Sequence, residues 1–188
     1  MGVKAASWLT RPEREVQEQP ERMLDALGLS PGQTVADVGA GVGYHAWRLA
    51  ARVGPSGRVY ATDLQPEMLA LLRANMAQRD VHNVLPILAT ADSTGLPDAS
   101  VDLALLVDVY HEAADPQAFL RQLRRALKAS GRLVLVEFRG EDPSVPIRSE
   151  HKMAADQVIA ELALGGFQLT ERQEFLPWQH LLVFVPVR

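Results

Sequence analysis

The sequence contains no cysteine, and this absence limits the chemistry that the chain can carry. Disulfide bonds, thiolate metal ligands and a thiol nucleophile are all excluded. The chain also lacks an apolar run of 18 residues that could span a bilayer. Its first ten residues, Met1 to Thr10, contain one lysine and no sustained apolar segment, so we expect no signal peptide. We therefore expect a cytoplasmic protein.

An excess of basic charge is missing as well. The 188 residues carry a formal net charge of −4 at pH 7. A chain with this net charge has no excess of positive charge that would attract a nucleic-acid backbone or an anionic membrane, so we expect neither as a partner. With 47% hydrophobic and 22% charged residues, the composition is that of a globular protein, and the length fits one domain over residues 1–188. The oligomeric state cannot be inferred from these numbers.

Three glycines at alternate positions are the most informative feature of the chain. The stretch V-A-D-V-G-A-G-V-G-Y begins as an apolar strand, Thr34 to Val38, and then contains Gly39, Gly41 and Gly43. A helical pattern follows at residues 46–53. Glycine lets the backbone take positive φ and approach a ligand closely, so this arrangement predicts a small-molecule site. A simple tight turn is the alternative.

The rest of the chain alternates apolar strands with helices. We expect strands at residues 34–38, 58–62, 84–89, 101–107 and 132–138, and helices after Pro66, after Pro116 and from about 150 to 164. Strands of this near-continuous apolar character, joined by helices, predict a parallel, doubly wound sheet covered on both faces. The last two runs, 167–175 and 180–187, are separated by four residues, so they should form an antiparallel hairpin.

Residues 1–32 precede this alternation as an N-terminal helical segment. Proline follows Arg11 and Gln19, at places where helices can begin. The charged residues from Arg11 to Glu21 are either a solvated face or a lid over the ligand. We thus divide the single domain into this segment, a ligand-binding core at 33–138, and a loop, helix and hairpin at 139–188.

Acidic residues follow the expected strands. In a sheet of this kind the ligand lies beyond the carboxyl ends of the strands, which here carry Asp63, Asp92, Asp108 and Glu137. Asp63 lies 20 residues beyond Gly43, where a carboxylate can accept both hydroxyl groups of a ribose. Asp92 could accept from an adenine amine and Ser93 could donate its backbone N–H to the ring, although Asp92 could instead cap a helix.

The third glycine of a dinucleotide fingerprint is absent, because Tyr44 occupies its position. No basic residue within the loop could meet a phosphate. The loop therefore suits an uncharged or cationic group better than a pyrophosphate.

The ordered motifs V-A-D-V-G-A-G-V-G, Y-A-T-D-L, A-D-S, D-V-Y-H-E-A-A-D-P and G-R-L-V-L-V-E-F resemble those of class I S-adenosylmethionine-dependent methyltransferases. The similarity covers about residues 30–140, and the nearest group is the small-molecule, methyltransferase type 11 or 25-like branch. It implies an α/β, Rossmann-like sheet of seven strands in the order 3-2-1-4-5-7-6, with the last strand antiparallel. It also implies S-adenosyl-L-methionine as cofactor and S-adenosyl-L-homocysteine as product.

Carried onto this chain, the resemblance assigns roles to individual residues. The loop from Gly39 to Gly43 would border the methionine part, with Asp37 anchoring the loop, and Asp63 would hold the ribose. Leu64 would pack on the adenine, and Val107 and Asp108 would lie near the sulfonium. The full implied set is Asp37, Gly39, Ala40, Gly41, Gly43, Asp63, Leu64, Asp92, Ser93, Val107 and Asp108.

Methyl transfer from a sulfonium needs mainly alignment of the reactants, and a general base only when the acceptor loses a proton. The candidates for that base are His111, Glu112 and Tyr110. His111 could instead order the turn before Asp115. His151, which we expect near the start of a helix, would be discouraged from protonation by the helix dipole, and a pocket-lining or surface role is favoured for it.

Further absences narrow the acceptor. Without cysteine, thiolate-dependent cytosine C5 methylation and cysteine-based arsenite methylation are excluded. The tetrapeptide [DNS]-P-P-[YFW] of amide and amine methyltransferases does not occur. Asp108, His111 and Glu112 show no regular ligand spacing, so we expect no metal site. A small molecule is the expected acceptor, recognised by the N-terminal segment, residues 110–112 and residues 138–151. The alternatives are a catalytically silent cofactor-binding module and an NAD(P)-dependent oxidoreductase.

Overall fold

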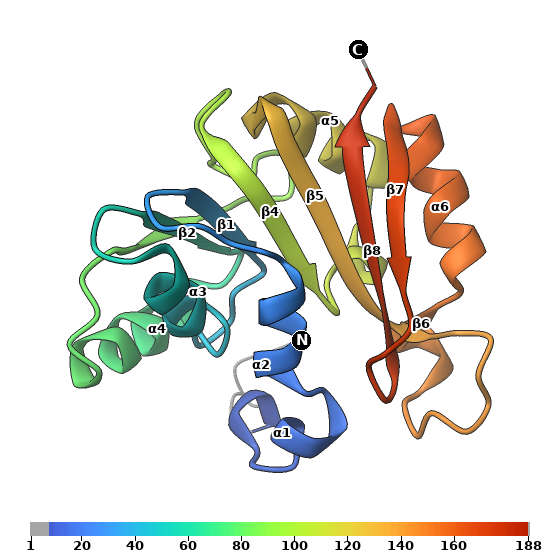
Figure 1. The fold of residues 1–188 in the computed structure, drawn as a ribbon, viewed down its shortest axis with the longest axis horizontal. Helices are drawn as coiled ribbons and strands as arrows, with labels where there is room; N and C mark the ends of the chain where they lie inside the picture. The colour runs from blue at the N-terminus through green and yellow to red at the C-terminus, as the bar shows by residue number, and fades with distance from the viewer. Residues whose placement is uncertain (1–7, 188) are drawn as a thin grey trace.

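The computed structural model describes residues 8–187, which form one mixed sheet with helices on both faces (Figure 1). The strand order is β3-β2-β1-β4-β5-β8-β7. Strands β1 to β5 are parallel to one another, and β8 runs antiparallel to both of its neighbours, β5 and β7. The strands are β1 (Thr34–Val38), β2 (Arg58–Asp63), β3 (Val84–Leu88), β4 (Val101–Val107), β5 (Leu127–Arg139), β6 (Lys152–Met153), β7 (Phe167–Gln173) and β8 (Gln179–Pro186). The predicted fold and strand order are confirmed, with β6 as an additional two-residue strand.

The helices begin largely where the sequence predicts. Proline occupies the first helical turn of α2, α4 and α5, and the Asp115 side chain caps α5 by accepting from Ala118 N at 2.9 Å. The helical elements are η2 (Trp8–Thr10), α1 (Arg14–Gln17), α2 (Pro20–Ala26), α3 (Ala46–Val53), α4 (Pro66–Gln78), η3 (Tyr110–Glu112), α5 (Pro116–Ala126), η4 (Ser149–His151) and α6 (Ala155–Leu164). No helix in the described part of the chain has the length and apolar character to cross a bilayer.

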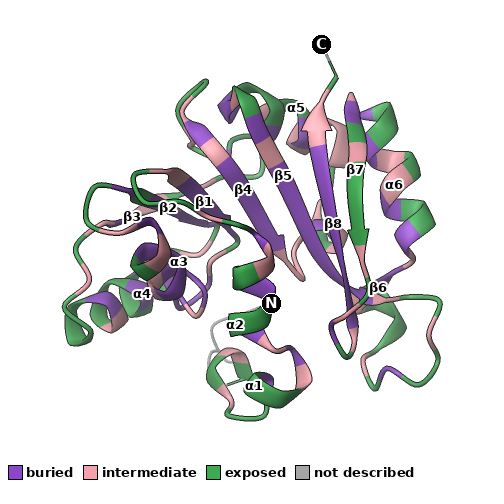
Figure 2. Ribbon diagram, viewed as in Figure 1, coloured by how far each residue is buried: buried purple, intermediate pink, exposed green. Residues whose placement is uncertain are grey.

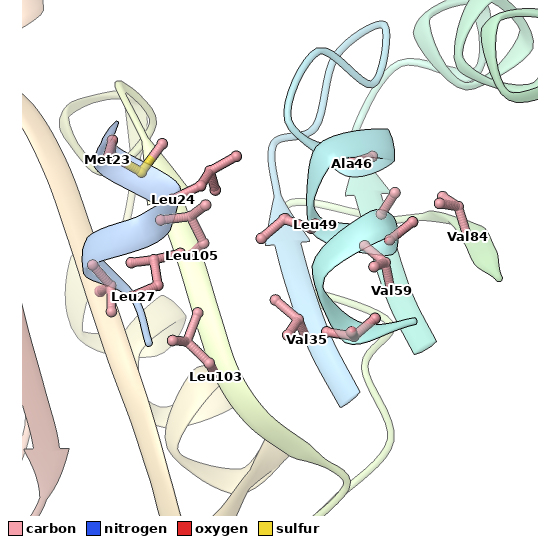
Figure 3. Close-up of a cluster of buried hydrophobic side chains, with 14 of the residues drawn as sticks. Met23, Leu24, Leu27, Val35, Ala46, Leu49, Val59, Val84, Leu103 and Leu105 are labelled. Carbon is pink, nitrogen blue, oxygen red and sulfur yellow. The ribbon is translucent and has the colours of Figure 1, made fainter. Parts of the chain in front are cut away.

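Two apolar clusters hold the helices against the sheet. On one face α2, α3 and α4 pack against residues such as Val35 and Leu105, and on the other face α5 and α6 pack against Ala36 and Leu106. Figure 3 shows part of the first cluster, with side chains of α2 and α3 beside the sheet. Consecutive strand residues point to opposite faces, so a strand buried on both sides is apolar at most positions. The central strands are accordingly buried along most of their length (Figure 2).

Two predicted boundaries are wrong. Strand β5 begins at Leu127 rather than 132, because Leu127 pairs with Val101 across a register shift in the β4–β5 ladder. The helix expected from about residue 150 begins only at Ala155, because Lys152 and Met153 pair with the end of β5. The dipole argument for His151 therefore does not apply, since His151 ends the turn η4, four residues before α6.

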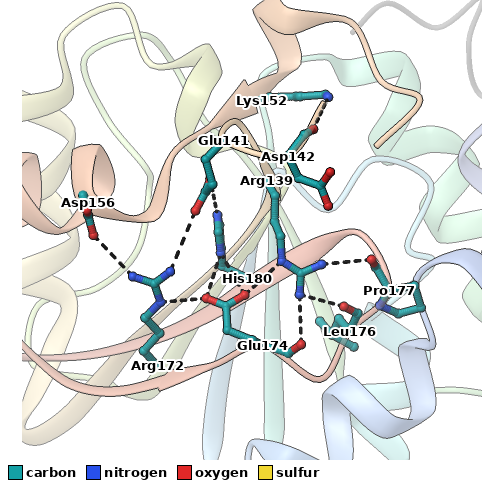
Figure 4. A network of polar contacts seen from close by, with 10 residues as sticks. All are labelled: Arg139, Glu141, Asp142, Lys152, Asp156, Arg172, Glu174, Leu176, Pro177 and His180. Carbon is teal, nitrogen blue, oxygen red and sulfur yellow. Dashed lines mark hydrogen bonds and ion pairs between the residues drawn. The ribbon is translucent and has the colours of Figure 1, made fainter. Parts of the chain in front are cut away.

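A polar network secures the segment that follows β5 (Figure 4). The His180 imidazole is fully buried, with Nδ1 3.1 Å from both carboxylate oxygens of Glu174 and Nε2 3.2 Å from Oε2 of Glu141. Arg139 donates to the carbonyl oxygens of Leu176 and Pro177 at 2.8 and 2.9 Å. These contacts tie residues 139–141 to the β7–β8 hairpin, and so position the loop that leads to η4.

Candidate cofactor and acceptor site

A cavity of about 780 Å³ lies beyond the carboxyl ends of β1, β2 and β4. The N-terminal segment supplies part of its wall through Trp8, Leu9, Arg11, Arg14 and Glu18. The opposite part of the wall comes from Phe138 and residues 146–148. The volume is within the range of small-molecule sites. The cavity therefore lies where the sequence predicts a ligand, and part of the N-terminal segment borders it.

Two of the three alternating glycines border this cavity. Gly39 and Gly41 have φ of 72° and 54° and belong to its wall. A Cβ at Gly39 would lie 2.6 Å from Val109 Cγ2, which shows how closely the loop passes the end of β4. Gly43 has a different role: a Cβ there would meet Leu72 Cγ of α4 at 2.9 Å. Gly43 and Ala40 are not part of the cavity wall, so Gly43 serves the packing of the loop on α4.

Asp63 fastens the glycine loop to the end of β2. Its Oδ2 accepts from Gly41 N and its Oδ1 accepts from Gln65 N, each at 2.9 Å. The side chain lies in the cavity wall next to Leu64, which is 60% exposed. Each carboxylate oxygen can accept a second hydrogen bond, so a ribose could still be held here.

Asp37 lies beneath the loop, near the end of β1, and is almost fully buried. Its Oδ2 has no hydrogen-bond partner among the described residues. Burial raises the pKa of Asp37 from 3.8 to about 7, with the Arg14 charge lowering it and the Asp63 charge raising it further. Asp37 is not part of the cavity wall, although Gly39, Gly41 and Asp63 are.

Asp108 has an unusual backbone at the end of β4. Its φ is 54°, in the left-handed region that non-glycine residues seldom adopt. Gln179 Nε2 donates to both carboxylate oxygens at 3.0 and 2.9 Å. Burial, followed by the nearby charges of Glu137 and Glu18, raises the pKa of Asp108 well above its usual range. Val107 and Asp108 both border the cavity, as expected.

Asp92 and Ser93 are placed differently from the expectation. Both are exposed, and neither is part of the cavity wall, although Thr90, Ala91 and Thr94 are. Ser93 N donates to Thr90 O at 3.2 Å, which closes a tight turn, so this N–H is already used. The structure therefore brings the backbone around these residues to the cavity, but not the two side chains.

At the other end of the cavity, a buried carboxylate orients a histidine. Glu137 Oε1 accepts from the backbone N–H groups of Val109 and Tyr110 at 3.1 and 2.7 Å. Its Oε2 lies 2.8 Å from His111 Nδ1. Burial alone lowers the pKa of His111, but the hydrogen bond and charge of Glu137 more than offset it, so the pKa is raised above 6.5. From the sequence, Glu137 was recognisable only as one of several acidic residues at strand ends, and its contact with His111 was not predicted.

The ring of His111 also meets a second histidine. His111 Nε2 lies 3.2 Å from His151 Nδ1 and 4.0 Å from Glu112 Oε1. All three residues border the cavity. The two histidines are 40 positions apart. Their approach results from β5 carrying the chain back across the sheet to η4, so no local pattern could have predicted it.

Tyr110 points away from this group. Its side chain is buried in the core, and its hydroxyl donates to Glu161 Oε2 of α6 at 3.1 Å. Burial, then the charge of Glu161, raises the pKa of Tyr110 above its ordinary value. Successive residues of the turn η3 point in different directions, so of the three candidate bases only His111 and Glu112 reach the cavity.

Comparison with known proteins identifies the family. The family described as "Methyltransferase domain" matches residues 36–135, more than half of the chain. An arsenite methyltransferase of Halobacterium salinarum is 33% identical over 107 residues, which are 57% of this chain and 27% of that protein. The ubiquinone/menaquinone biosynthesis C-methyltransferase UbiE of Hahella chejuensis is 30% identical over 128 residues, 68% of this chain and 51% of that protein.

The chain thus spans between about a quarter and a half of the length of these curated relatives. A crystal structure of a SAM-dependent methyltransferase from Aquifex aeolicus superposes with a TM-score of 0.94 at 27% identity, covering 100% of both chains. These matches favour a methyltransferase over the oxidoreductase alternative. The chain belongs to the methyltransferase domain family and has the fold of a solved S-adenosylmethionine-dependent methyltransferase.

Proposed function

We propose that this protein transfers a methyl group from S-adenosylmethionine to a small-molecule acceptor bound in the cavity described above. The observation that carries the proposal is the continuity of that cavity. Gly39, Gly41 and Asp63 border one part of it, and His111 and His151 border another. A single space can therefore hold cofactor and acceptor side by side.

The cofactor fits the residues at its proposed end. Asp63 and Leu64 would hold the ribose and the face of the adenine. The loop at Gly39 and Gly41 leaves space for the methionine part, and Asp37 would support this loop from beneath. Val107 and Asp108 would border the sulfonium.

The cofactor supplies an electrophilic methyl group, and the chain supplies alignment and a dry environment. Orienting two reactants can provide much of the rate of such a displacement. The acceptor's lone pair forms the new bond to the methyl carbon while the C–S bond breaks, and its electron pair stays on sulfur. Phe119, Phe138 and Ile147 line the cavity and would exclude water from this reaction.

The acceptor would be recognised by the two segments that form the outer wall. Trp8 and Leu9 come from the N-terminal segment, and Phe138, Pro146 and Ile147 come from β5 and the following loop. These side chains favour an acceptor with a substantial apolar part. The names of UbiE and of the arsenite methyltransferase indicate small acceptors, which supports a small acceptor here. Because this chain contains no cysteine, it cannot methylate arsenite by a cysteine-based mechanism. Division into a single domain and a cytoplasmic location stay predictions.

The first test is calorimetry with S-adenosylhomocysteine and with NAD on the same preparation. We expect saturable, micromolar binding of S-adenosylhomocysteine and no saturable binding of NAD. Tighter binding of NAD would contradict the cofactor assignment.

The second test is a methyl-transfer screen against a library of small metabolites, with release of S-adenosylhomocysteine as the readout. We expect turnover with an apolar, nucleophile-bearing compound, and loss of that turnover in His111→Ala. The matched control is His82→Ala, which changes an exposed histidine outside the cavity wall. Cofactor binding with no turnover across the library would favour the silent module.

A further inference from the structure

A cluster of two histidines and one glutamate borders the acceptor part of the cavity. Its members are His111, Glu112 and His151, and their ligand atoms all lie within 4.8 Å of one another. We propose that this cluster binds a divalent transition-metal ion such as Zn²⁺, with an open coordination position directed into the cavity.

The distance between the histidine nitrogens matches a shared metal. Two nitrogen ligands at about 2.1 Å from one tetrahedral ion lie about 3.4 Å apart. His111 Nε2 and His151 Nδ1 are 3.2 Å apart. The Glu112 carboxylate, 43% exposed, has its nearest oxygen 4.0 Å from His111 Nε2, so a small side-chain rotation would complete a three-ligand face. Two imidazoles and one carboxylate form a donor set that suits Zn²⁺ better than Mg²⁺.

The orientation of His111 provides the second argument. The side chain of Glu137 is completely buried, and its Oε2 meets His111 Nδ1 at 2.8 Å. A carboxylate only accepts hydrogen bonds, so in the neutral ring Nδ1 carries the proton and the lone pair of Nε2 faces His151. A carboxylate behind a histidine is the arrangement that fixes the tautomer of metal-binding imidazoles. Glu137 is held in turn by two backbone N–H groups, so the His111 ring is already oriented.

The position in the cavity gives the ion a role in the proposed function, on which this part of the inference rests. An acceptor hydroxyl bound at the open position would lose its proton to solvent more readily, as metal-bound water does. The resulting oxyanion would form the bond to the methyl carbon, and the C–S electron pair would remain on sulfur. The inference thus names an oxygen nucleophile as the acceptor class.

A shared proton is the competing explanation for the short distance between the two rings, because one imidazole can donate to the other. The two explanations differ in one respect that can be measured without any acceptor. A metal site binds Zn²⁺ tightly at these residues, whereas two imidazoles that only share a proton would not bind it tightly.

The test measures the binding of Zn²⁺ alone to the full chain after treatment with a chelator, by calorimetry and by competition with a chromogenic chelator. We expect one equivalent to bind. His151→Ala should weaken binding by at least about 100-fold and Glu137→Gln by roughly 10–100-fold, the usual cost of losing the carboxylate behind a metal-binding imidazole. His82→Ala should leave it unchanged, since His82 is exposed and pairs with Asp80. Co²⁺ bound at the site should show the visible absorption of a nitrogen-ligated ion, and His151→Ala should abolish it.

Two outcomes overturn the inference: no tight Zn²⁺ binding by the wild-type protein, or equal binding by the wild type and His151→Ala. Thermal unfolding and S-adenosylhomocysteine binding are measured on every variant, so a folding defect is recognised as such. Cofactor binding without Zn²⁺ binding would overturn the metal site and leave the proposed methyl transfer standing. The reverse result would point against the cofactor assignment.

Discussion

The oxygen atoms of two aspartates at the ends of β1 and β2 differ in how they are satisfied. Both oxygens of Asp63 accept backbone hydrogen bonds, whereas Oδ2 of Asp37 has no partner among the described residues. Asp63 thus helps to hold the folded chain together. The unpaired oxygen of Asp37 has an energetic cost in the folded chain.

That cost makes stability depend on pH. Asp37 ionises near 3.8 in an unfolded chain but at about 7 when folded, so between these values the folded protein holds an additional proton. The free energy of unfolding therefore falls as the pH rises from about 4 to about 7, and then levels off. An asparagine at this position cannot ionise and removes this dependence.

We expect Asp37→Asn to match the wild type near pH 4 and to be more stable near pH 8, by at most roughly 4 kcal/mol. Urea unfolding at the two pH values measures this. Equal stability at pH 8 would show that Asp37 is ionised and satisfied in the folded protein.

Asp63 and Asp92 allow a matched comparison of two acids that were both predicted to bind cofactor. Asp63→Ala removes the proposed ribose acceptor and also releases Gly41 N. We expect S-adenosylhomocysteine binding to weaken by at least about 1.5 kcal/mol, a typical value for a charge-assisted hydrogen bond. Asp92→Ala should have little effect, because Asp92 is exposed and outside the cavity wall. Calorimetry on both variants decides; a large loss in Asp92→Ala would restore its predicted role.

At the scale of elements, the glycine loop is held from two sides. Gly41 is fastened to β2 through Asp63, and Gly43 packs on α4 beside Leu72 and Met76. The loop is therefore positioned before any ligand arrives.

Gly43→Ala tests this packing. At φ of 83°, alanine is strained, and its Cβ would lie 2.9 Å from Leu72 Cγ. Strain and overpacking together should lower the free energy of unfolding by about 2–5 kcal/mol. Gly28→Ala is the control: Gly28 also has positive φ, 58°, but a Cβ there would meet nothing within 4 Å. Chemical unfolding should show a clearly smaller loss for Gly28→Ala, and equal losses would mean that backbone strain alone matters.

The elements themselves could be predicted because buried parallel strands need apolar residues at most positions, and the five runs from 34 to 138 have them. The glycine loop and Asp63 were recognisable from spacing. The short strand β6 was not, because two residues such as Lys152 and Met153 carry no periodicity, and their pairing with β5 is a tertiary effect.

The directions of side chains within a short turn also could not be predicted from the sequence. Tyr110, His111 and Glu112 are adjacent in η3, yet Tyr110 enters the core beside α6 while His111 faces the cavity. The identities of three adjacent residues do not predict the direction in which each side chain points. The contact between His111 and His151 depends on the path of the whole intervening chain, so only the folded structure reveals it.

For the whole molecule, the N-terminal segment forms part of the cavity wall. Trp8 belongs to the cavity wall and is 48% exposed, and Arg14 and Glu18, also in the wall, form an ion pair at 2.6 Å. A ligand in the cavity would change the surroundings of this indole ring.

We expect the tryptophan emission to change on titration with S-adenosylhomocysteine, saturating at the calorimetric dissociation constant. The Trp8→Phe variant should lose most of this change, whereas Trp178→Phe, outside the cavity wall, should keep it. A signal that persists in Trp8→Phe would show that the N-terminal segment does not contact the bound cofactor.

The reversed direction of β8 has a consequence for the order in which the site is assembled. Because β8 runs antiparallel between β5 and β7, its first residue, Gln179, lies at the same edge as the ends of the parallel strands and donates to Asp108. Before synthesis reaches Gln179, the chain already contains the glycine loop, Asp63 and His111, but the Asp108 carboxylate does not yet have its donor. The glycine loop, Asp63 and His111 are thus synthesised before the residue that completes the side-chain hydrogen bonds of Asp108.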